Sequence, residues 1–135
     1  MVTTDSFVLI DSNILFDITG QDPVWAEWSI DAFSRVQDGR INPIIYAEIC
    51  YQASSVEEVD QLLRNLDLGY SELPREALYL ASKAFRYYRQ RGGQKTSPLP
   101  DFFIGAHAAA LDIPILTRDV ARYQAYFSSV KLISP

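Results

Sequence analysis

The apolar positions of the chain change repeatedly between two kinds of spacing, which predicts a series of strands and helices. The segment Phe7-Val8-Leu9-Ile10 is continuously apolar, as is typical of a strand buried on both faces. It ends at Asp11-Ser12-Asn13, so a carboxylate follows this strand directly. From Asp22-Pro23 onward, apolar residues recur at helical spacing until Gly39, which predicts a helix.

The middle of the chain continues the alternation. Ile41 opens a second short apolar strand. The segment from Ile44 to Ile49 favours a helix that carries Glu48, but so short an apolar run also fits a strand. The sequence Ser55-Val56-Glu57-Glu58 has the capping-box pattern, and an amphipathic helix follows it as far as Gly69.

The C-terminal half shows the same succession. Its expected elements are a strand over 70–73, a helix from 74 to the Gly92-Gly93 pair, a loop to 100, a helix over 101–111, a strand over 113–116, a short helix and a strand over 130–133. Strands that alternate with helices predict an α/β fold, a three-layer sandwich whose largely parallel sheet of about five strands has helices on both faces. Ligands of such sheets bind beyond the carboxyl ends of the strands, where strand order reverses, and Asp11 and Asp119 follow two strands at that edge.

Length and composition limit the class of protein. A chain of 135 residues with 48% apolar residues fits one folded domain, 1–135. It contains no apolar run near the ~18 residues that a membrane span needs. The start of the sequence lacks the basic and apolar regions of a signal peptide, and Cys50 is the only cysteine, which excludes an internal disulfide. We therefore expect a cytoplasmic protein that does not enter a membrane.

A formal net charge of −5 argues against a general polyanion binder. Five of the twelve basic residues nevertheless fall in residues 83–95, a segment without an acid; they are Lys83, Arg86, Arg89, Arg91 and Lys95. This segment leads to Asp101 and is a candidate for binding RNA phosphates, with Tyr87 or Tyr88 to stack a base. A solvated helix face explains it equally well. Arg118 is likewise a candidate for a phosphate contact or for a simple pair with an acid.

Four acids are candidates for a shared site because each lies at a strand end or near the start of a helix that follows a strand. They are Asp11, Glu48, Asp101 and Asp119. Carboxylates gathered in one pocket repel one another, so the cluster requires protons or cations. Oxygen ligands select Mg²⁺ or Mn²⁺, and two such ions ~3.5–4 Å apart can activate water and stabilise the leaving oxygen of a phosphodiester.

Each of these acids taken alone is more often a surface group or a helix cap. The placement of two of them favours a shared site, because Asp11 follows a buried apolar run and Asp101 precedes Phe-Phe-Ile-Gly-Ala. An acid so near the core needs a partner. His107 fits a packed or surface residue better than a general base, and Cys50 fits a small core residue. The remaining acids that we considered are interpreted as caps or turn residues: Asp17, Asp22 and Asp112.

Four short segments together resemble the PIN-domain nucleases, and especially the VapC-type toxins of toxin-antitoxin pairs. The segments are Ile10-Asp11-Ser12-Asn13, Ala47-Glu48, Pro100-Asp101-Phe102-Phe103-Ile104-Gly105-Ala106 and Ile115-Leu116-Thr117-Arg118-Asp119. They resemble the first to fourth motifs of the family in order, and the resemblance spans nearly the whole chain.

The resemblance implies a metal-dependent endoribonuclease that leaves a 5′-phosphate and a 3′-hydroxyl. Asp11, Glu48 and Asp101 would be principal metal ligands and Asp119 a weaker or second-metal ligand. Asn13 and Thr117 would support the carboxylates and water. It also implies one or two Mg²⁺ or Mn²⁺ ions, an RNA substrate, a homodimer and a cognate antitoxin that blocks the pocket.

Two other functions remain open from the sequence. One is a phospho-acceptor receiver domain, for which Lys131 supplies the required lysine, but the middle strand near 70–73 ends without an acceptor Asp. The other is a catalytically silent relative that only binds RNA or a partner, against which the intact acids argue.

Overall fold

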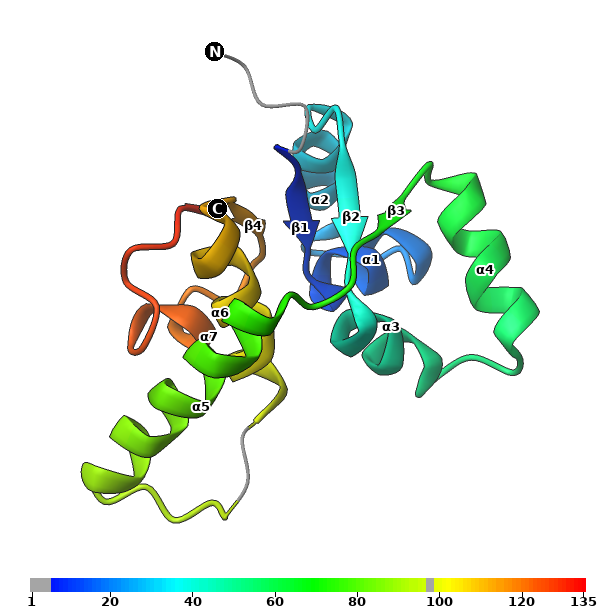
Figure 1. Cartoon of the computed structure of the whole chain (residues 1–135). Coiled ribbons are helices and arrows are strands. Elements are labelled where there is room, and N and C mark those ends of the chain that lie inside the picture. The colour runs from blue at the N-terminus through cyan, green and yellow to red at the C-terminus, as the bar shows by residue number, and fades with distance from the viewer. Residues whose placement is uncertain (1–5, 97–98) are drawn as a thin grey trace.

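A five-stranded sheet forms the centre of the computed structural model, which describes residues 6–96 and 99–135 (Figure 1). Its strands are β1 (Val8–Ile10), β2 (Gly39–Ile41), β3 (Gly69–Tyr70), β4 (Ile115–Leu116) and β5 (Leu132–Ile133). Their order is β3-β2-β1-β4-β5, and every neighbouring pair is parallel. The chain runs outward from β1 to β3 and then returns across the sheet to β4, so strand order reverses between β1 and β4.

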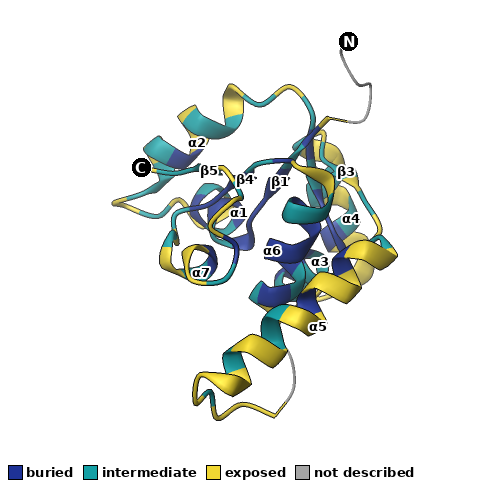
Figure 2. Ribbon diagram, turned by 60° about the vertical axis from the view of Figure 1, so that its left-hand side comes forward, coloured by how far each residue is buried: buried dark blue, intermediate teal, exposed yellow. Residues whose placement is uncertain are grey.

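Seven helices accompany the strands in the described part of the chain. They are α1 (Ser12–Thr19), α2 (Ala26–Ser34), α3 (Pro43–Cys50), α4 (Val56–Asn65), α5 (Arg75–Gln90), α6 (Pro100–Leu111) and α7 (Ala121–Gln124). Helices α1 and α2 pack together on one side of the strands, and α5 packs along α6 on the other (Figure 2). The prediction of a parallel α/β sandwich is confirmed.

The core lies in two clusters. In the larger one, the side chains of Leu9, Ile10, Ile115 and Leu116 are fully buried at the centre of the sheet. The smaller cluster joins α5 to α6 and includes Ala77, Ala81, Phe102, Ala106 and Phe127. Gly105 belongs to this contact, since a Cβ there would lie 2.4 Å from Cδ2 of Phe127. The glycine therefore lets α6 carry Asp101 close to the rest of the domain.

The structure confirms the helix favoured for residues 44–49 and corrects two other expectations. Residues 44–49 are helical because Asn42 accepts a hydrogen bond from the amide of Ile45 (2.9 Å) and Pro43 occupies the first turn. Ile41 ends its strand instead of opening it. Helix α1 was not predicted at all, although its first residue follows Asp11 directly.

In the described residues, no helix is both long and apolar enough to span a membrane.

Candidate active site

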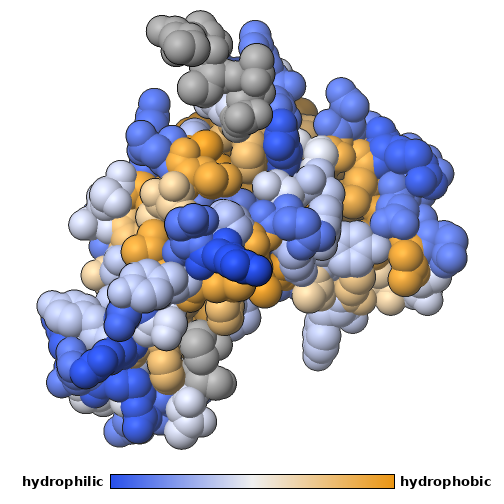
Figure 3. Space-filling model, viewed as in Figure 1, coloured by the Kyte–Doolittle hydropathy of each residue, from blue (hydrophilic) through white to orange (hydrophobic). Residues whose placement is uncertain are grey.

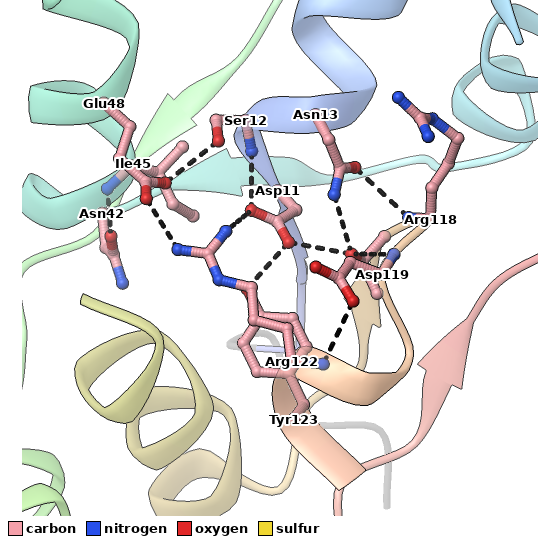
Figure 4. Close-up of polar contacts among 11 residues, drawn as sticks. Asp11, Ser12, Asn13, Asn42, Ile45, Glu48, Arg118, Asp119, Arg122 and Tyr123 are labelled. Atoms are coloured by element: carbon pink, nitrogen blue, oxygen red, sulfur yellow. Dashed lines mark hydrogen bonds and ion pairs between the residues drawn. The ribbon is translucent and has the colours of Figure 1, made fainter. Parts of the chain in front are cut away.

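Asp11 lies where strand order reverses, at the carboxyl end of β1. Its side chain is 0% exposed, yet every hydrogen bond that it accepts comes from a group at this edge (Figure 4). Oδ1 accepts from the amide of Ser12 (2.8 Å) and from Nη1 of Arg122 (3.0 Å). Oδ2 accepts from the hydroxyls of Thr117 and Tyr123, both at 2.8 Å. A buried carboxylate needs such donors because burial removes the water that would otherwise bind its oxygens.

Thr117, which follows β4, connects the two central strands. Its hydroxyl donates to Asp11 and accepts from the Nδ2 of Asn13 (3.2 Å) and from the amide of Asp119 (3.0 Å). Asn13 in turn accepts from the amide of Arg118 (3.2 Å) through Oδ1. Thr117 therefore touches the Asp11 carboxylate directly, whereas Asn13 acts on it through Thr117.

Glu48 reaches the same place from α3. Its Oε1 accepts from the Ser12 hydroxyl (3.0 Å), and its Oε2 accepts from Nη2 of Arg122 (2.6 Å). The Asn42 cap sets the start of α3 and thereby the direction from which Glu48 enters. Ser12 thus serves both carboxylates, with its amide on Asp11 and its hydroxyl on Glu48.

Arg122 is one of two residues of this pocket that sequence reasoning missed. Its guanidinium bridges Asp11 and Glu48 and is 18% exposed (Figure 4). Burial opposes its charge, but the two carboxylates outweigh burial and raise the pKa of Arg122 above its ordinary value. An arginine one helical turn after a strand-end acid was the available signal, because that spacing returns the side chain toward the strand end.

Tyr123 was also missed. Its ring is fully buried, and burial, together with the charge of Asp11, raises the pKa of its phenol. The phenol therefore remains a hydrogen-bond donor to Asp11. An aromatic residue in a short amphipathic segment is ordinarily interpreted as core, and the ring of Tyr123 is indeed part of the core.

Asp101 and Asp119 complete the acidic environment. Asp101 lies in the first turn of α6, and burial raises the pKa of its carboxyl above the usual range. The charges of Glu48 and Asp119 raise it further, while Arg122 opposes them. Asp119 is exposed, and its Oδ1 accepts from the amide of Arg122 (3.2 Å). The guanidinium of Arg122 thus binds two of the four predicted acids, Asp11 and Glu48, while Asp101 and Asp119 lie near enough for charges of this pocket to act on the Asp101 carboxyl.

A hard divalent cation suits these donors, because they are carboxylate oxygens whose charges are only partly balanced. Within residues 6–96 and 99–135, however, no three acidic, histidine or cysteine side chains gather closely enough to hold one ion. Arg122 lies between Asp11 and Glu48 instead. The donor chemistry fits Mg²⁺ or Mn²⁺, and in this structure Arg122 is the counter-ion of the two carboxylates.

The basic candidates separate into two groups. Those on α5 and the loop after it are all exposed: Lys83, Arg86, Arg89, Arg91 and Lys95. Hydrophilic residues cover this end of the molecule (Figure 3). Arg118 differs, since it forms a bidentate pair with the buried Asp17 (2.6 and 2.9 Å). The pairing explanation therefore accounts for Arg118.

Asp17 is neither a cap nor a turn residue, which corrects our expectation. It lies on the buried side of α1, where the hydroxyl of Ser29 also donates to it (2.7 Å). Asp22 does cap its turn through the amides of Val24 and Trp25. Among the other residues considered, His107 is fully buried, Cys50 is half-buried and Asp112 ends α6.

Comparisons with solved structures agree with the fold of this chain. The chain resembles the VapBC2 complex of Rickettsia felis bound to a promoter DNA fragment, with a TM-score of 0.67, 15% identity and coverage of 94% of this chain and 97% of that one. DNA-bound VapBC from Salmonella typhimurium has a TM-score of 0.67 and 15% identity, over 96% of this chain and 98% of that one. FitAcB from Neisseria gonorrhoeae has a TM-score of 0.64 and 17% identity, over 95% of this chain and 97% of that one. Identities this low show the fold alone. No curated protein matches the sequence.

The family model for the PIN domain matches residues 8–127, which is most of the chain. The protein therefore belongs to the PIN-domain family. Its strand order, β3-β2-β1-β4-β5, also differs from the 2-1-3-4-5 order of receiver domains, so the receiver alternative is excluded.

Proposed function

We propose that this protein is a metal-dependent endoribonuclease and the toxin of a type II toxin-antitoxin pair. The observation that carries the proposal is the meeting of Asp11 and Glu48 on one cation, with Asp101 and Asp119 in the same electrostatic environment, at the switch point of a PIN-domain sheet. The PIN family is generally composed of nucleases, and the solved neighbours are complexes of toxins with antitoxins.

In this proposal, the four acids hold one or two Mg²⁺ or Mn²⁺ ions, which supply Lewis acidity and an activated water when bound. The chain's own groups set the carboxylates. Thr117 and Tyr123 fix Oδ2 of Asp11, and Ser12 fixes Oε1 of Glu48, so each carboxylate keeps a defined orientation. Asp101 belongs to the first turn of α6 and lies near enough to Glu48 and Asp119 for their charges to raise the pKa of its carboxyl.

The exposed basic side chains of α5 and its loop are proposed to hold RNA phosphates: Lys83, Arg86, Arg89, Arg91 and Lys95. The proposal does not rely on Arg118, which pairs with Asp17. A homodimer and a cognate antitoxin that covers the pocket belong to the same proposal, as does a cytoplasmic location. The VapBC complexes of the structural neighbours support the antitoxin.

The toxin proposal is tested by controlled expression in a bacterial host. Wild-type protein should arrest growth, and Asp101→Asn, expressed to the same soluble level, should not. Asp101 suits this test because its side chain is only half-buried, and the hydrogen bond that its carboxyl accepts from its own backbone amide can also be accepted by the side-chain oxygen of Asn. Equal arrest by both proteins would contradict a role of the acidic pocket in toxicity, and no arrest by either would contradict the toxin assignment in that host.

A silent PIN domain is the second candidate function. The bridging of Asp11 and Glu48 by Arg122 favours it, because the pair is already neutralised without metal. A silent domain would retain RNA affinity without any cleavage that depends on Mg²⁺ or Mn²⁺.

A further inference from the structure

Arg122 holds one oxygen of each carboxylate, and hydroxyl groups hold the other. On Asp11, Thr117 and Tyr123 donate to Oδ2, while Nη1 of Arg122 binds Oδ1. On Glu48, the Ser12 hydroxyl donates to Oε1, while Nη2 binds Oε2 at 2.6 Å. The guanidinium thus lies on the two oxygens that no hydroxyl binds, of which Oδ1 of Asp11 also accepts from the Ser12 amide (2.8 Å).

A metal ion and this guanidinium compete for the same position. A Mg²⁺ ion binds carboxylate oxygen at roughly 2.0–2.1 Å, closer than either nitrogen of Arg122. If Arg122 kept both contacts, its charge would lie within a few ångströms of the ion in a partly buried pocket, where like charges repel strongly. Simultaneous occupancy of the pair is therefore unfavourable.

We propose that Arg122 is a built-in counter-cation that occupies the Asp11–Glu48 pair in the metal-free protein and must leave it before a divalent ion binds there. This inference rests on the proposed function, because it assumes that these carboxylates bind metal. Arg122 neutralises the acids while the site is empty, which stabilises the folded chain, and it lowers the apparent affinity for metal by the same interaction.

The local structure permits this exchange. Arg122 lies on α7, a helix of four residues at the rim of the sheet, and its side chain is partly exposed. Rotation of the side chain alone can bring the guanidinium to solvent, since the neighbouring Tyr123 anchors the helix through its buried ring. When the guanidinium leaves the pair, it loses its charge-assisted hydrogen bonds to both carboxylates. Metal binding must offset the free energy of these lost bonds.

The test is Mn²⁺ binding measured by calorimetry on the full chain, without RNA, for wild type and Arg122→Met. Methionine keeps much of the length of the side chain but removes the charge and the fork. We expect Mn²⁺ to bind Arg122→Met at least about tenfold more tightly, which corresponds to about 1.4 kcal/mol. In chelator, the same variant should melt at a lower temperature than wild type, because Asp11 and Glu48 lose their counter-ion.

Arg35→Met is the matched control. It changes the net charge equally, but Arg35 is an exposed residue that pairs with Asp31. Its Mn²⁺ affinity should equal that of wild type, because an exposed distant charge is screened by salt. Arg122→Gln is the second variant if Arg122→Met does not fold, and it should show the same gain in affinity.

The outcomes separate this inference from the proposed function. Equal or weaker Mn²⁺ affinity in both Arg122 variants, with binding still present, would overturn competition by Arg122 and leave the metal site intact. No binding to wild type or to either variant would overturn the metal site itself and with it this inference. A gain in affinity that Arg35→Met reproduces would assign the effect to net charge, which also overturns the proposal.

Discussion

Replacement of His107 by Gln should remove a large part of the chain's loss of stability in acid. His107 is fully buried in α6, and its Nδ1 lies 3.1 Å from the Nδ2 of Asn42. The Oδ1 of Asn42 is already bound to the amide of Ile45, so Asn42 presents an N–H group to the imidazole. Nδ1 must therefore be an acceptor. Protonation of Nδ1 would place its N–H against the N–H of Asn42, so that two donors would face each other. Burial lowers the pKa of His107 from 6.5 to about 4.

The magnitude and the sign follow from linkage. The unfolded chain binds the proton near pH 6.5 and the folded chain only near 4, so the stability contributed by the neutral imidazole is present above 6.5 and is lost as pH falls toward 4. The full difference corresponds to about 3 kcal/mol, and the part lost between pH 8 and pH 5 is about 2 kcal/mol. Because His107 is the only histidine, no other imidazole contributes to this interval.

Urea unfolding at pH 8 and pH 5 measures this effect. The free energy of unfolding of wild type should fall between the two pH values by about 2 kcal/mol more than that of His107→Gln, whose amide oxygen can still accept from Asn42. Asn42→Asp is the companion variant, because Asp caps helices as well as Asn but stabilises the imidazolium. It should also reduce the loss in acid. The same pH dependence in wild type and His107→Gln would show that the buried imidazole does not cause the loss of stability in acid.

Three further predictions concern the acidic pocket, the packing of α6 and the basic segment. Asp101→Asn should raise the melting temperature in chelator at neutral pH, since burial raises the pKa of this carboxyl and its charge costs stability above that pKa. Millimolar Mn²⁺ should then stabilise wild type more than the variant. An equal shift of both melting temperatures by metal would contradict a shared site. Gly105→Ala should cost roughly 1–3 kcal/mol in urea unfolding, because its Cβ would overlap the ring of Phe127, and an unchanged midpoint would show that the ring moves freely. Neutralising three basic side chains by Arg86→Gln, Arg89→Gln and Arg91→Gln should lower RNA affinity, as measured by fluorescence anisotropy. The log–log slope of affinity against salt should flatten by up to ~0.7 for each phosphate that is no longer bound. An unchanged slope would identify the segment as a solvated helix face.

The sheet could be predicted because its signal is local. A run such as 7–10, buried on both faces, is apolar without interruption, and the polar residues that end it fall where parallel strands deliver side chains. Helix α1 was missed for a related reason. Its eight residues follow the strand after a single cap residue, Asp11, so no separate loop in the sequence marks the start of the helix. Missing α1 also concealed that Asp17 lies on a buried helix face.

The site could be predicted only in its acids. Strand ends and short motifs indicate where carboxylates gather, but not which cation neutralises them. Arg122 and Tyr123 enter the pocket because α7 turns back toward β1, and both contacts join residues more than a hundred positions apart. Such contacts depend on tertiary geometry, which periodicity does not carry. The pairing of Arg118 with Asp17 likewise required the position of α1.

Mapping the ends that the purified protein produces in total RNA tests whether the four acids form a metal-dependent ribonuclease site. Wild type with Mg²⁺ or Mn²⁺ should create new internal 5′-phosphate ends at a limited set of sites, because the proposed reaction lets water attack the phosphorus and displaces the 3′ oxygen, which leaves the phosphate on the downstream fragment. Excess chelator should abolish these ends, and folded Asp101→Asn and Glu48→Gln should produce few of them. Undiminished cleavage in chelator, or full activity of folded Asp101→Asn in Mg²⁺, would contradict a metal-dependent ribonuclease built on these four acids.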